Sequence, residues 1–449
     1  MSQNRRITSS RLGRLSLLGR LAGGMAGSAA SEGVRQLLKG RRPSIEDVFL
    51  TPKNMNRVAD KLSEMRGAAM KLGQLMSMDS GQVLPEELTN LLEKLRDSAH
   101  HMPLGQVAKV LKASWGDKWD KNFTRFNFTP IAAASIGQVH QAELKDGRKV
   151  AIKIQYPGIR ASIDSDVSNV ATLLKALRLL PKDLDVENLL VDAKDQLHAE
   201  ADYGLEAQSL KNFSLLLQED NRFRLPDVVD ELCSSEVLTM SFMEGSPIDD
   251  LKKENAELKN KIAHYLTELA FREVFEWGVA QTDPNFANYL YTPSGIINLL
   301  DFGATRSYSQ HSRDALKELL QACYEADDRK VAAAAQSVGY LADEDSNKYE
   351  EMIVNLLKTA TEPLRAAGLV DFKDLNLAQK MSDQVVEMRV NQGFGRLPPT
   401  EILFLHRKLG GLYLLLTKIN ACIDVEAIAK PYLSQASTTE KSSGNNNDD

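Results

Sequence analysis

The sequence predicts an α+β protein in which a small antiparallel β-sheet is surrounded by helices. Two pairs of β-rich segments, within 137–155 and 288–300, are each joined by a short run of turn residues, which predicts two hairpins. Segments with the apolar spacing of helices precede, separate and follow these hairpins. With 449 residues, 43% hydrophobic and 26% charged, the chain has the composition of a globular protein with a substantial core.

The first 42 residues are predicted to form a basic arm on an acidic body. They carry nine basic side chains and one acidic, a charge of +8, so the net charge of −6 leaves −14 on the rest of the chain. An arginine- and serine-rich start resembles an organellar transit peptide; a basic amphipathic segment on an anionic membrane surface and plain disorder are the alternatives. No apolar run approaches the roughly 20 residues that span a bilayer.

Composition also excludes some classes of protein. The acidic total argues against a dedicated nucleic-acid-binding protein, which would need a clear excess of basic residues. Three widely spaced cysteines fit neither a disulfide framework nor a zinc site, which favours a reducing compartment.

Residues 55–76 give the clearest helix, because their apolar residues recur in alternating steps of three and four and form one stripe. Lys71 and Gln74 fall on the opposite face, three residues apart, so their side chains are neighbours. Taken alone, this pair is typical of a solvated polar face. Helical spacing continues through 86–95 and 104–114.

The first hairpin joins Gly137–Leu144 to Arg148–Gln155. Its second strand contains the apolar run Val150-Ala151-Ile152, which ends at Lys153. A lysine at a strand end is usually only solvated, but its context points to nucleotide binding. The preceding turn holds three alanines and a serine, Ala132 to Ser135, where a nucleotide-binding hairpin carries G-x-G-x-x-G. Alanine restricts the backbone, so we expect a tighter loop that still contacts a nucleotide.

A long helical stretch over 187–218 contains Glu200, Asp202 and Glu206. Asp202 and Glu206 are four residues apart and are expected to share a face of this helix, whereas Glu200 points elsewhere. A solvated acidic helix is the alternative. A kinase-type site next to Lys153 would need a helix glutamate to hold the lysine against the α- and β-phosphates.

The second half of the chain carries a more specific pattern. A buried strand at 236–243 and a helix near 256–277 precede Asp283 and Asn288, which have the D-x-x-x-x-N spacing of a kinase catalytic loop. The second hairpin follows, turning at Thr292-Pro293-Ser294-Gly295, and leads to Asp301-Phe302-Gly303. This hairpin is expected to return Asp301 beside Asn288, giving two hard oxygen ligands for Mg²⁺.

These motifs, in this number and order, resemble the UbiB/ADCK atypical protein-kinase-like family, most closely its coenzyme-Q-biosynthesis branch. The resemblance runs from about Arg11 to Tyr432. Its carriers are Lys71-Leu72-Gly73-Gln74 (the family's KxGQ), Ala132-Ala133-Ala134-Ser135, Val150-Ala151-Ile152-Lys153, Glu200-Ala201-Asp202-Tyr203 with Glu206, Gln281-Thr282-Asp283-Pro284-Asn285, Asp301-Phe302-Gly303 and Leu405-His406-Arg407-Lys408.

The resemblance implies a bilobal protein-kinase-like fold that binds ATP or ADP with Mg²⁺. Lys153 would bind the phosphates and pair with Glu206, while Asp283 would be the catalytic aspartate and Asn288 and Asp301 would hold Mg²⁺. The remaining nucleotide contacts would come from the loop residues Ala132, Ala133, Ala134 and Ser135 and the hinge residues Met240, Ser241, Phe242 and Met243.

The resemblance also implies a gate over this site. The KxGQ helix, with Lys71 and Gln74, would lie across the place where a peptide substrate otherwise docks, in contact with Glu200 and Asp202. The expected organisation is therefore a basic membrane-proximal arm (1–42), a helical KxGQ extension (43–128), an N-lobe with the alanine-rich loop and hinge (129–244), a helical C-lobe (245–433) and a disordered tail (434–449).

Two departures from ordinary protein kinases shape the expected activity. No His-Arg precedes Asp283, and the glycine loop is replaced. We therefore expect a Mg²⁺-dependent ATPase or small-molecule kinase that supports ubiquinone biosynthesis at a membrane. A protein kinase and a catalytically silent nucleotide-binding scaffold of a biosynthetic complex are the alternatives.

The expected partners are a nucleotide, an anionic membrane surface or quinone-precursor lipid, and ubiquinone-biosynthesis proteins, with no nucleic acid. The family's basic segment begins within a dozen residues of Met1, which favours a bacterial-type cytoplasmic protein peripherally associated with the inner membrane. In a eukaryote the expected location is the mitochondrion.

Overall fold

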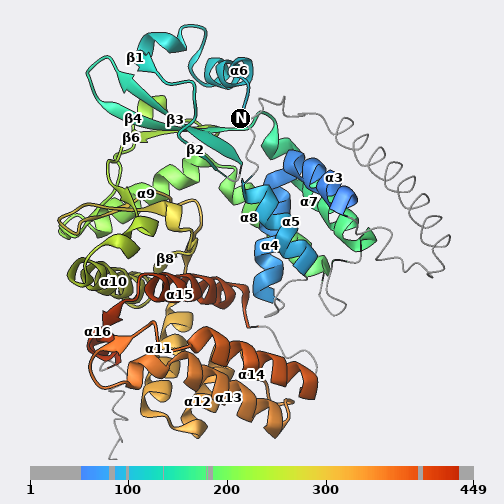
Figure 1. Ribbon diagram of the computed structural model, residues 1–449, viewed down its shortest axis with the longest axis vertical. Coiled ribbons are helices and arrows are strands. Elements are labelled where there is room, and N and C mark those ends of the chain that lie inside the picture. Colours follow the sequence, from blue (N-terminus) through green and yellow to red (C-terminus); the bar gives the residue numbers. More distant parts are fainter. Residues whose placement is uncertain are drawn as a thin grey trace, which may run out of the picture. The chain divides into compact units, whose positions relative to one another are not determined.

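The computed structural model describes residues 52–79, 86–97, 101–134, 136–177, 179, 186–392 and 398–433 (Figure 1). The predictions for the basic arm, for Ser135, for the side chain of Gln74 and for the C-terminal tail lie outside the described part. The chain forms two compact units, the first comprising Met1–Ile248 and Ala287–Thr305 and the second Asp249–Phe286 and Arg306–Asp449.

An antiparallel sheet of the first unit carries the predicted lysine strand. The strand order is β1-β3-β4-β6, and the short β2 also pairs with β3. The β3–β4 hairpin, with Gly147 at φ 86° in its turn, confirms the first predicted hairpin. The bounds are β1 Phe123–Phe126, β2 Ala132–Ala133, β3 Gly137–Leu144, β4 Lys149–Gln155 and β6 Val237–Ser241. Because β1 pairs with β3, this sheet starts before the predicted lobe boundary at 129.

The alternation of side chains along β4 determines the face of the sheet on which Lys153 lies. Val150, Ile152 and Ile154 are buried with Val110 and Leu111 of helix α6 in one core. Figure 1 shows α6 (Leu104–Trp115) beside this sheet. Successive side chains of a strand point to opposite faces, so Lys153 lies on the face away from that core.

The described part of the first unit contains six further helices, of which α9 packs against β6 of the sheet. The predicted helix 55–76 is interrupted by a 3₁₀ turn, and the predicted helix 187–218 is in fact two helices, so that part of the prediction was wrong. The helix α7 was not anticipated. Their bounds are α3 Pro52–Leu62, η1 Ser63–Met65, α4 Arg66–Asp79, α5 Glu86–Asp97, α7 Ile159–Ala176, α8 Val186–Glu200 and α9 Tyr203–Leu216.

The break between α8 and α9 has a local cause. Asp202 has an extended backbone and its carboxylate accepts a hydrogen bond from the Gly204 amide at 3.0 Å, which makes it the N-cap of α9. The four-residue spacing predicted that Asp202 and Glu206 share a helix face. This was wrong, because Asp202 lies before the first turn of α9. Glu206 lies in the first turn of α9.

A second small sheet of the first unit has the order β5-β10-β9-β7 and confirms the second predicted hairpin. Its turn contains Gly295 at φ 85°, a backbone conformation that favours glycine. The bounds are β5 Phe223–Arg224, β7 Ser246–Pro247, β9 Tyr289–Tyr291 and β10 Ile297–Leu299, with short 3₁₀ turns at η2 Trp119–Asn122, η3 Asp230–Leu232 and η6 Phe286–Asn288.

The second unit is mainly helical, as predicted for 310–433. Its α10 runs into a π-helical turn, η5, a local irregularity that is common at functional sites. The bounds are η4 Ile248–Lys253, α10 Ala256–Phe271, η5 Arg272–Trp277, β8 Val279–Gln281, β11 Thr305–Ser307, α11 Gln310–Glu325, α12 Asp328–Val338, α13 Asn347–Ala360, η7 Glu362–Arg365, β12 Val370–Asp371, α14 Leu377–Gln392, α15 Thr400–Lys418, β13 Cys422–Ile423 and α16 Val425–Leu433.

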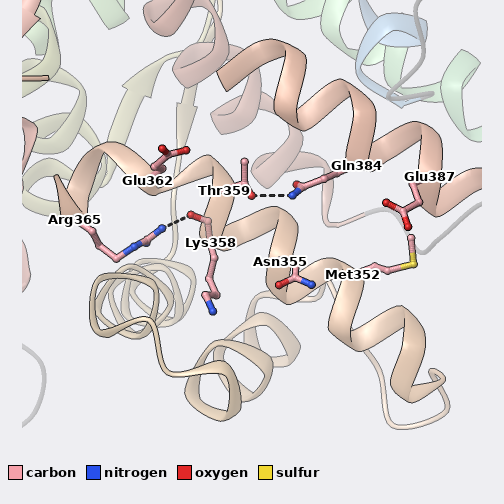
Figure 2. A pocket seen from close by; sticks show the side chains of 8 residues that line it. All are labelled: Met352, Asn355, Lys358, Thr359, Glu362, Arg365, Gln384 and Glu387. Atoms are coloured by element: carbon pink, nitrogen blue, oxygen red, sulfur yellow. Dashed lines mark hydrogen bonds between the residues drawn. The ribbon is translucent and has the colours of Figure 1, made fainter. Parts of the chain in front are cut away.

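A cavity of about 380 Å³ lies in this unit among α13, η7 and α14 (Figure 2). The Gln384 amide donates a hydrogen bond to the Thr359 hydroxyl at 2.9 Å across it. Lys358 and Arg365 line it but are held by Asp328 and by the Cys323 carbonyl. The cavity contains none of the predicted site residues.

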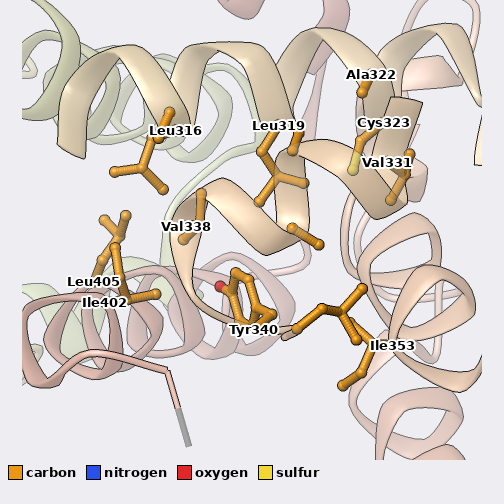
Figure 3. Close-up of a cluster of buried hydrophobic side chains, with 14 of the residues drawn as sticks. Leu316, Leu319, Ala322, Cys323, Val331, Val338, Tyr340, Ile353, Ile402 and Leu405 are labelled. Atoms are coloured by element: carbon orange, nitrogen blue, oxygen red, sulfur yellow. The ribbon is translucent and has the colours of Figure 1, made fainter. Parts of the chain in front are cut away.

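The core of the second unit joins α11, α12, α13 and α15. Figure 3 shows Leu316 and Leu319 of α11 facing Val338, Ile353 and Leu405 from the other helices. Burial of these side chains stabilises the unit by roughly 1.5–3 kcal/mol each relative to exposure. The core thereby anchors α15, which carries residues 405–408 of the sequence motif.

Candidate functional site

Lys153, Glu206 and Asp301 meet in one cluster of the first unit, which we call the Lys153 cluster. Lys153 is 6% exposed, and its ammonium group donates to Asp301 Oδ2 at 2.8 Å and to Glu206 Oε1. The three residues come from β4, from α9 and from the segment after β10, which are far apart in the sequence. The structure therefore brings together the lysine, the glutamate and the DFG aspartate that the sequence singled out.

Packing of the DFG phenylalanine holds this cluster in place. Phe302 is buried, and its ring lies 4.7 Å, centroid to centroid, from the ring of Phe213. Phe213 is on α9, two turns after Glu206. The same helix therefore carries Glu206 and contacts Phe302, the residue after Asp301. The Gly303 amide donates to Asp301 Oδ1 at 3.0 Å and fixes that carboxylate.

The cluster holds two carboxyl groups and one ammonium group, so it has excess negative charge when Glu206 is ionised. Burial raises the pKa of Glu206 from 4.5 to about 7, and the neighbouring Asp301 charge adds to this effect. Burial also acts on Asp301, but the Lys153 charge outweighs it and holds the pKa of Asp301 below its ordinary value. For Lys153, burial is outweighed by Asp301 and Glu206, so its pKa is raised and it stays charged.

The β9–β10 hairpin brings Asn288 opposite Leu300, the residue before Asp301. Tyr289 pairs with Leu299, and the Leu300 amide donates to the Asn288 carbonyl at 3.0 Å. Among the described residues no group of three or more His, Cys, Asp or Glu is placed to hold a metal. An amide and a carboxylate oxygen with phosphate oxygens are the donor set on which Mg²⁺ relies in nucleotide sites, so these residues fit that ion.

The alanine loop is built onto the edge of the sheet. Ala132 and Ala133 pair with Val139 and Gln138, and the Ala134 amide donates to the Gly137 carbonyl at 2.9 Å. Gly137 was missed in the sequence. A methyl group there would collide with the Ile154 carbonyl, so only glycine fits. Its position five residues after Ala132 is that of the third glycine of G-x-G-x-x-G, which was the available signal.

The predicted hinge begins with the last two residues of β6 and continues through Phe242 and Met243. The amides of Ser241 and Phe242 donate to the carbonyls of Asp227 and Lys149 at 2.8 and 2.9 Å, so neither is open to a ligand. Within the described chain, no hydrogen bond occupies the amide of Met243. Adenine recognition by this hinge would therefore rely on Met243 rather than on the two residues before it.

The KxGQ lysine is buried, not solvated. Lys71 is 4% exposed and forms an ion pair with Glu200 at the end of α8, against which α4 packs. The structure thus pairs the lysine of the KxGQ motif with Glu200, the first acidic residue of the Glu200–Asp202 motif. Asp202 instead caps α9 and lies 3.3 Å from the Arg160 guanidinium.

In the second unit, Asp283 is held by a residue of the Leu405–Lys408 motif. The Arg407 guanidinium donates to Asp283 Oδ1 at 2.6 Å, and the side-chain amide of Gln281 donates to the Asp283 carbonyl at 2.9 Å. Sequence reasoning had assigned no role to Arg407. It lies 124 residues from Asp283, and the arginine that ordinary kinases place just before the aspartate is absent.

Two further residues of α15 complete the support, which we call the Asp283 cradle. Lys408 forms a buried ion pair with Glu273 of the π-helical turn and donates to the Gln281 carbonyl at 2.9 Å. A methyl group on Gly411 would collide with Pro284, so this helix approaches the loop closely. Lys408 and Gly411 fix the backbone on the two sides of Asp283, and Arg407 holds its carboxylate.

No helix in the described part of the chain is both long enough and apolar enough to cross a membrane.

Known proteins are similar to this chain in sequence and in fold. Residues 94–335 match the ABC1 atypical kinase-like domain. The chain is 36% identical to the mitochondrial atypical kinase COQ8 of Saccharomyces cerevisiae, over 94% of this chain and 85% of that protein. It is 37% identical to the mitochondrial atypical kinase COQ8B of Rattus norvegicus, over 94% and 80% respectively.

One solved structure extends the comparison to the fold. The complex of Rv3197 with erythromycin from Mycobacterium tuberculosis matches with a TM-score of 0.59 at 24% identity, covering 90% of this chain and 98% of that chain. Together with the domain match, this likeness confirms the predicted α+β kinase-like fold.

Proposed function

Because the chain belongs to the ABC1 atypical kinase-like family, we propose that it binds Mg-ATP and turns it over slowly in support of ubiquinone biosynthesis at a membrane. Membership confirms the resemblance that the motifs carried. It also confirms the class of enzyme, an atypical kinase of coenzyme Q biosynthesis.

The Lys153 cluster is the observation that carries the ATP-binding proposal. A lysine held between a helix glutamate and a DFG aspartate is positioned to contact the α- and β-phosphates. The buried Phe302–Phe213 contact keeps both carboxylates in place before nucleotide arrives. This preorganisation lowers the cost of binding a highly charged ligand.

Asn288 and Asp301 are the residues proposed to hold Mg²⁺, which when bound would neutralise phosphate charge. The excess negative charge of the Lys153 cluster favours a cation at this place. Asp301 is 32% exposed in its side chain, so solvent ions reach it, whereas Glu206 at 6% is sequestered.

Asp283 is proposed to accept the proton of the attacking water or acceptor hydroxyl. Its carboxylate is 24% exposed, and Arg407 donates to its Oδ1. An arginine cannot be deprotonated near neutral pH, so Arg407 orients Asp283 without competing for the proton.

The buried Lys71–Glu200 pair favours ATP hydrolysis or a small acceptor over a protein substrate. Breaking a buried pair by withdrawing one partner costs about 3–5 kcal/mol. Helix α4 is therefore held against α8 unless a ligand compensates for that cost. The membrane is proposed to act at this gate and through the basic arm.

Phosphate release by the purified full chain tests the proposal. Wild-type protein is incubated with Mg-ATP, with and without vesicles containing cardiolipin. We expect turnover that rises with vesicles and falls at least 100-fold in Asp301→Asn. The matched control is Asp328→Asn, which removes an exposed carboxylate on α12 and should leave turnover unchanged.

Three results would contradict the proposal in different ways. No phosphate release, or release unaffected by Asp301→Asn, would exclude a turnover site built on the Lys153 cluster. Transfer of labelled γ-phosphate to proteins would show a protein kinase. Thermal stabilisation by ATP with no turnover under any lipid condition would show a nucleotide-binding scaffold.

A further inference from the structure

The hydroxyl of Tyr203 is a buried polar group that no proposed step uses. Tyr203 begins α9 and is 3% exposed. Among the described residues its hydroxyl oxygen has no hydrogen-bond partner. Leaving a buried polar group unpaired destabilises the folded protein, so such a group points to a partner that the free chain does not contain.

The hydroxyl lies beside Gly137, at the end of the alanine loop. A methyl group placed on Gly137 would lie 3.0 Å from the Tyr203 oxygen. In the β3–β4 ladder Gly137 is opposite Gln155, and Val139 is opposite Lys153. Opposite residues of an antiparallel pair point to the same face, so Gly137 and Lys153 share the face on which the hydroxyl lies.

The chemistry of the hydroxyl suits an anionic ligand. Burial raises the pKa of Tyr203, and the charges of Lys153, Glu206 and Asp301 act on the phenol as well. The group is therefore neutral and keeps its proton at physiological pH, which makes it a hydrogen-bond donor. The ammonium group of Lys153 already donates to two carboxylates, so Tyr203 supplies a donor that is not yet engaged.

We propose that Tyr203 is a nucleotide-binding residue whose hydroxyl donates a hydrogen bond to a phosphate oxygen of the bound Mg-nucleotide. Phosphate oxygens accept but cannot donate, which matches a lone donor beside the loop and the lysine. Gly137 makes room for this contact, because any side chain there would cover the hydroxyl. The inference rests on the proposed function, since it concerns the same nucleotide site.

Tyr203→Phe in the full chain tests this role, because it removes the hydroxyl and keeps the ring. Mg-ATP affinity is measured by calorimetry, and stability without nucleotide by urea unfolding. We expect affinity to fall about tenfold, while stability stays the same or rises because an unpaired polar group is gone. Two signals of opposite sign are thus expected from one substitution.

The matched control is Tyr413→Phe. The Tyr413 hydroxyl is already bonded, since it accepts from the Leu377 amide at 2.9 Å. Its removal should lower stability and leave Mg-ATP affinity unchanged. Both variants lose one oxygen atom from a tyrosine, so their difference isolates the effect of an unpaired hydroxyl at the nucleotide site.

The outcomes separate this inference from the proposed function. Wild-type protein that does not bind Mg-ATP overturns both. Wild-type binding with unchanged affinity in Tyr203→Phe overturns the role of Tyr203 alone. A loss of unliganded stability in Tyr203→Phe as large as in the control also overturns it, because the hydroxyl would then already have a partner such as a buried water.

Discussion

The Lys153 cluster of the first unit and the Asp283 cradle of the second both hold carboxylates with basic side chains, but their charges differ. In the cluster one lysine faces two carboxylates, Glu206 and Asp301. In the cradle two cations, Arg407 and Lys408, face two carboxylates, Asp283 and Glu273. With Glu206 ionised, the cluster therefore has an unbalanced negative charge, whereas the cradle is neutral within the protein.

This difference separates a ligand site from a support. An unbalanced buried charge is unfavourable until a cation or ligand compensates it, so the Lys153 cluster gains from binding Mg-nucleotide. The cradle already has its partners and needs no ligand. Each region still has one reachable carboxylate, Asp301 at 32% and Asp283 at 24%, and one buried, Glu206 at 6% and Glu273 at 2%.

The largest expected effect is on turnover in the cluster. Asp301→Asn should reduce phosphate release at least 100-fold, because it removes the only carboxylate charge of the proposed Asn288–Asp301 ligand pair for Mg²⁺. The same variant should lose little unfolding free energy, since Glu206 still pairs with Lys153. Urea unfolding beside the turnover assay checks this. A large loss of stability would show that the cluster, like the cradle, depends on every partner.

The next largest effect is on stability, when one ion pair of the cradle is broken. Lys408→Met should lower the free energy of unfolding by about 3–5 kcal/mol, because it leaves Glu273 buried without its cation. Adding Glu273→Leu should recover much of that loss, because both charges are then removed. Chemical unfolding of the single and double variants measures it. A double variant as unstable as Lys408→Met alone would show that the loss does not come from an unpaired Glu273.

A pH dependence should distinguish the cluster from the cradle. With a pKa of about 7 in the folded state against 4.5 in the free side chain, Glu206 keeps a proton on folding. Its stabilisation is complete below pH 4.5 and is lost as the pH rises through about 7, a change on the order of 3 kcal/mol. Glu206→Gln cannot titrate, so its unfolding free energy should vary less across that window. An unchanged pH profile would contradict the raised pKa.

The smallest effect concerns orientation of Asp283. Arg407→Met should lower turnover about tenfold, since the carboxylate loses its charged hydrogen-bond donor but stays accessible to water. Mg-ATP affinity should be unchanged, because Arg407 holds Asp283, to which no nucleotide contact is assigned. Arg407→Lys keeps the charge and should recover part of the rate. Equal losses in both variants would show that the planar guanidinium geometry, not the charge, matters.

Short-range patterns explain why much of the site could be predicted. The two hairpins were readable because turn residues and β-rich runs are local, and the second hairpin brings Leu300 to Asn288 by backbone pairing. Glu206 could be selected only through the family resemblance. The break at Asp202 was missed, because an aspartate inside an apolar helical pattern reads as helix interior until its side chain is seen to cap the next helix.

By itself, the sequence determined the fold class, the strand that carries Lys153 and the hairpin that joins Asn288 to Asp301, because each depends on residues close together in the chain. Only the tertiary structure decided that Glu200 receives Lys71, that Arg407 holds Asp283 and that the Tyr203 hydroxyl is left unpaired beside Gly137. These facts depend on segments as far as 129 residues apart, and contacts at that separation follow from packing rather than from any local pattern.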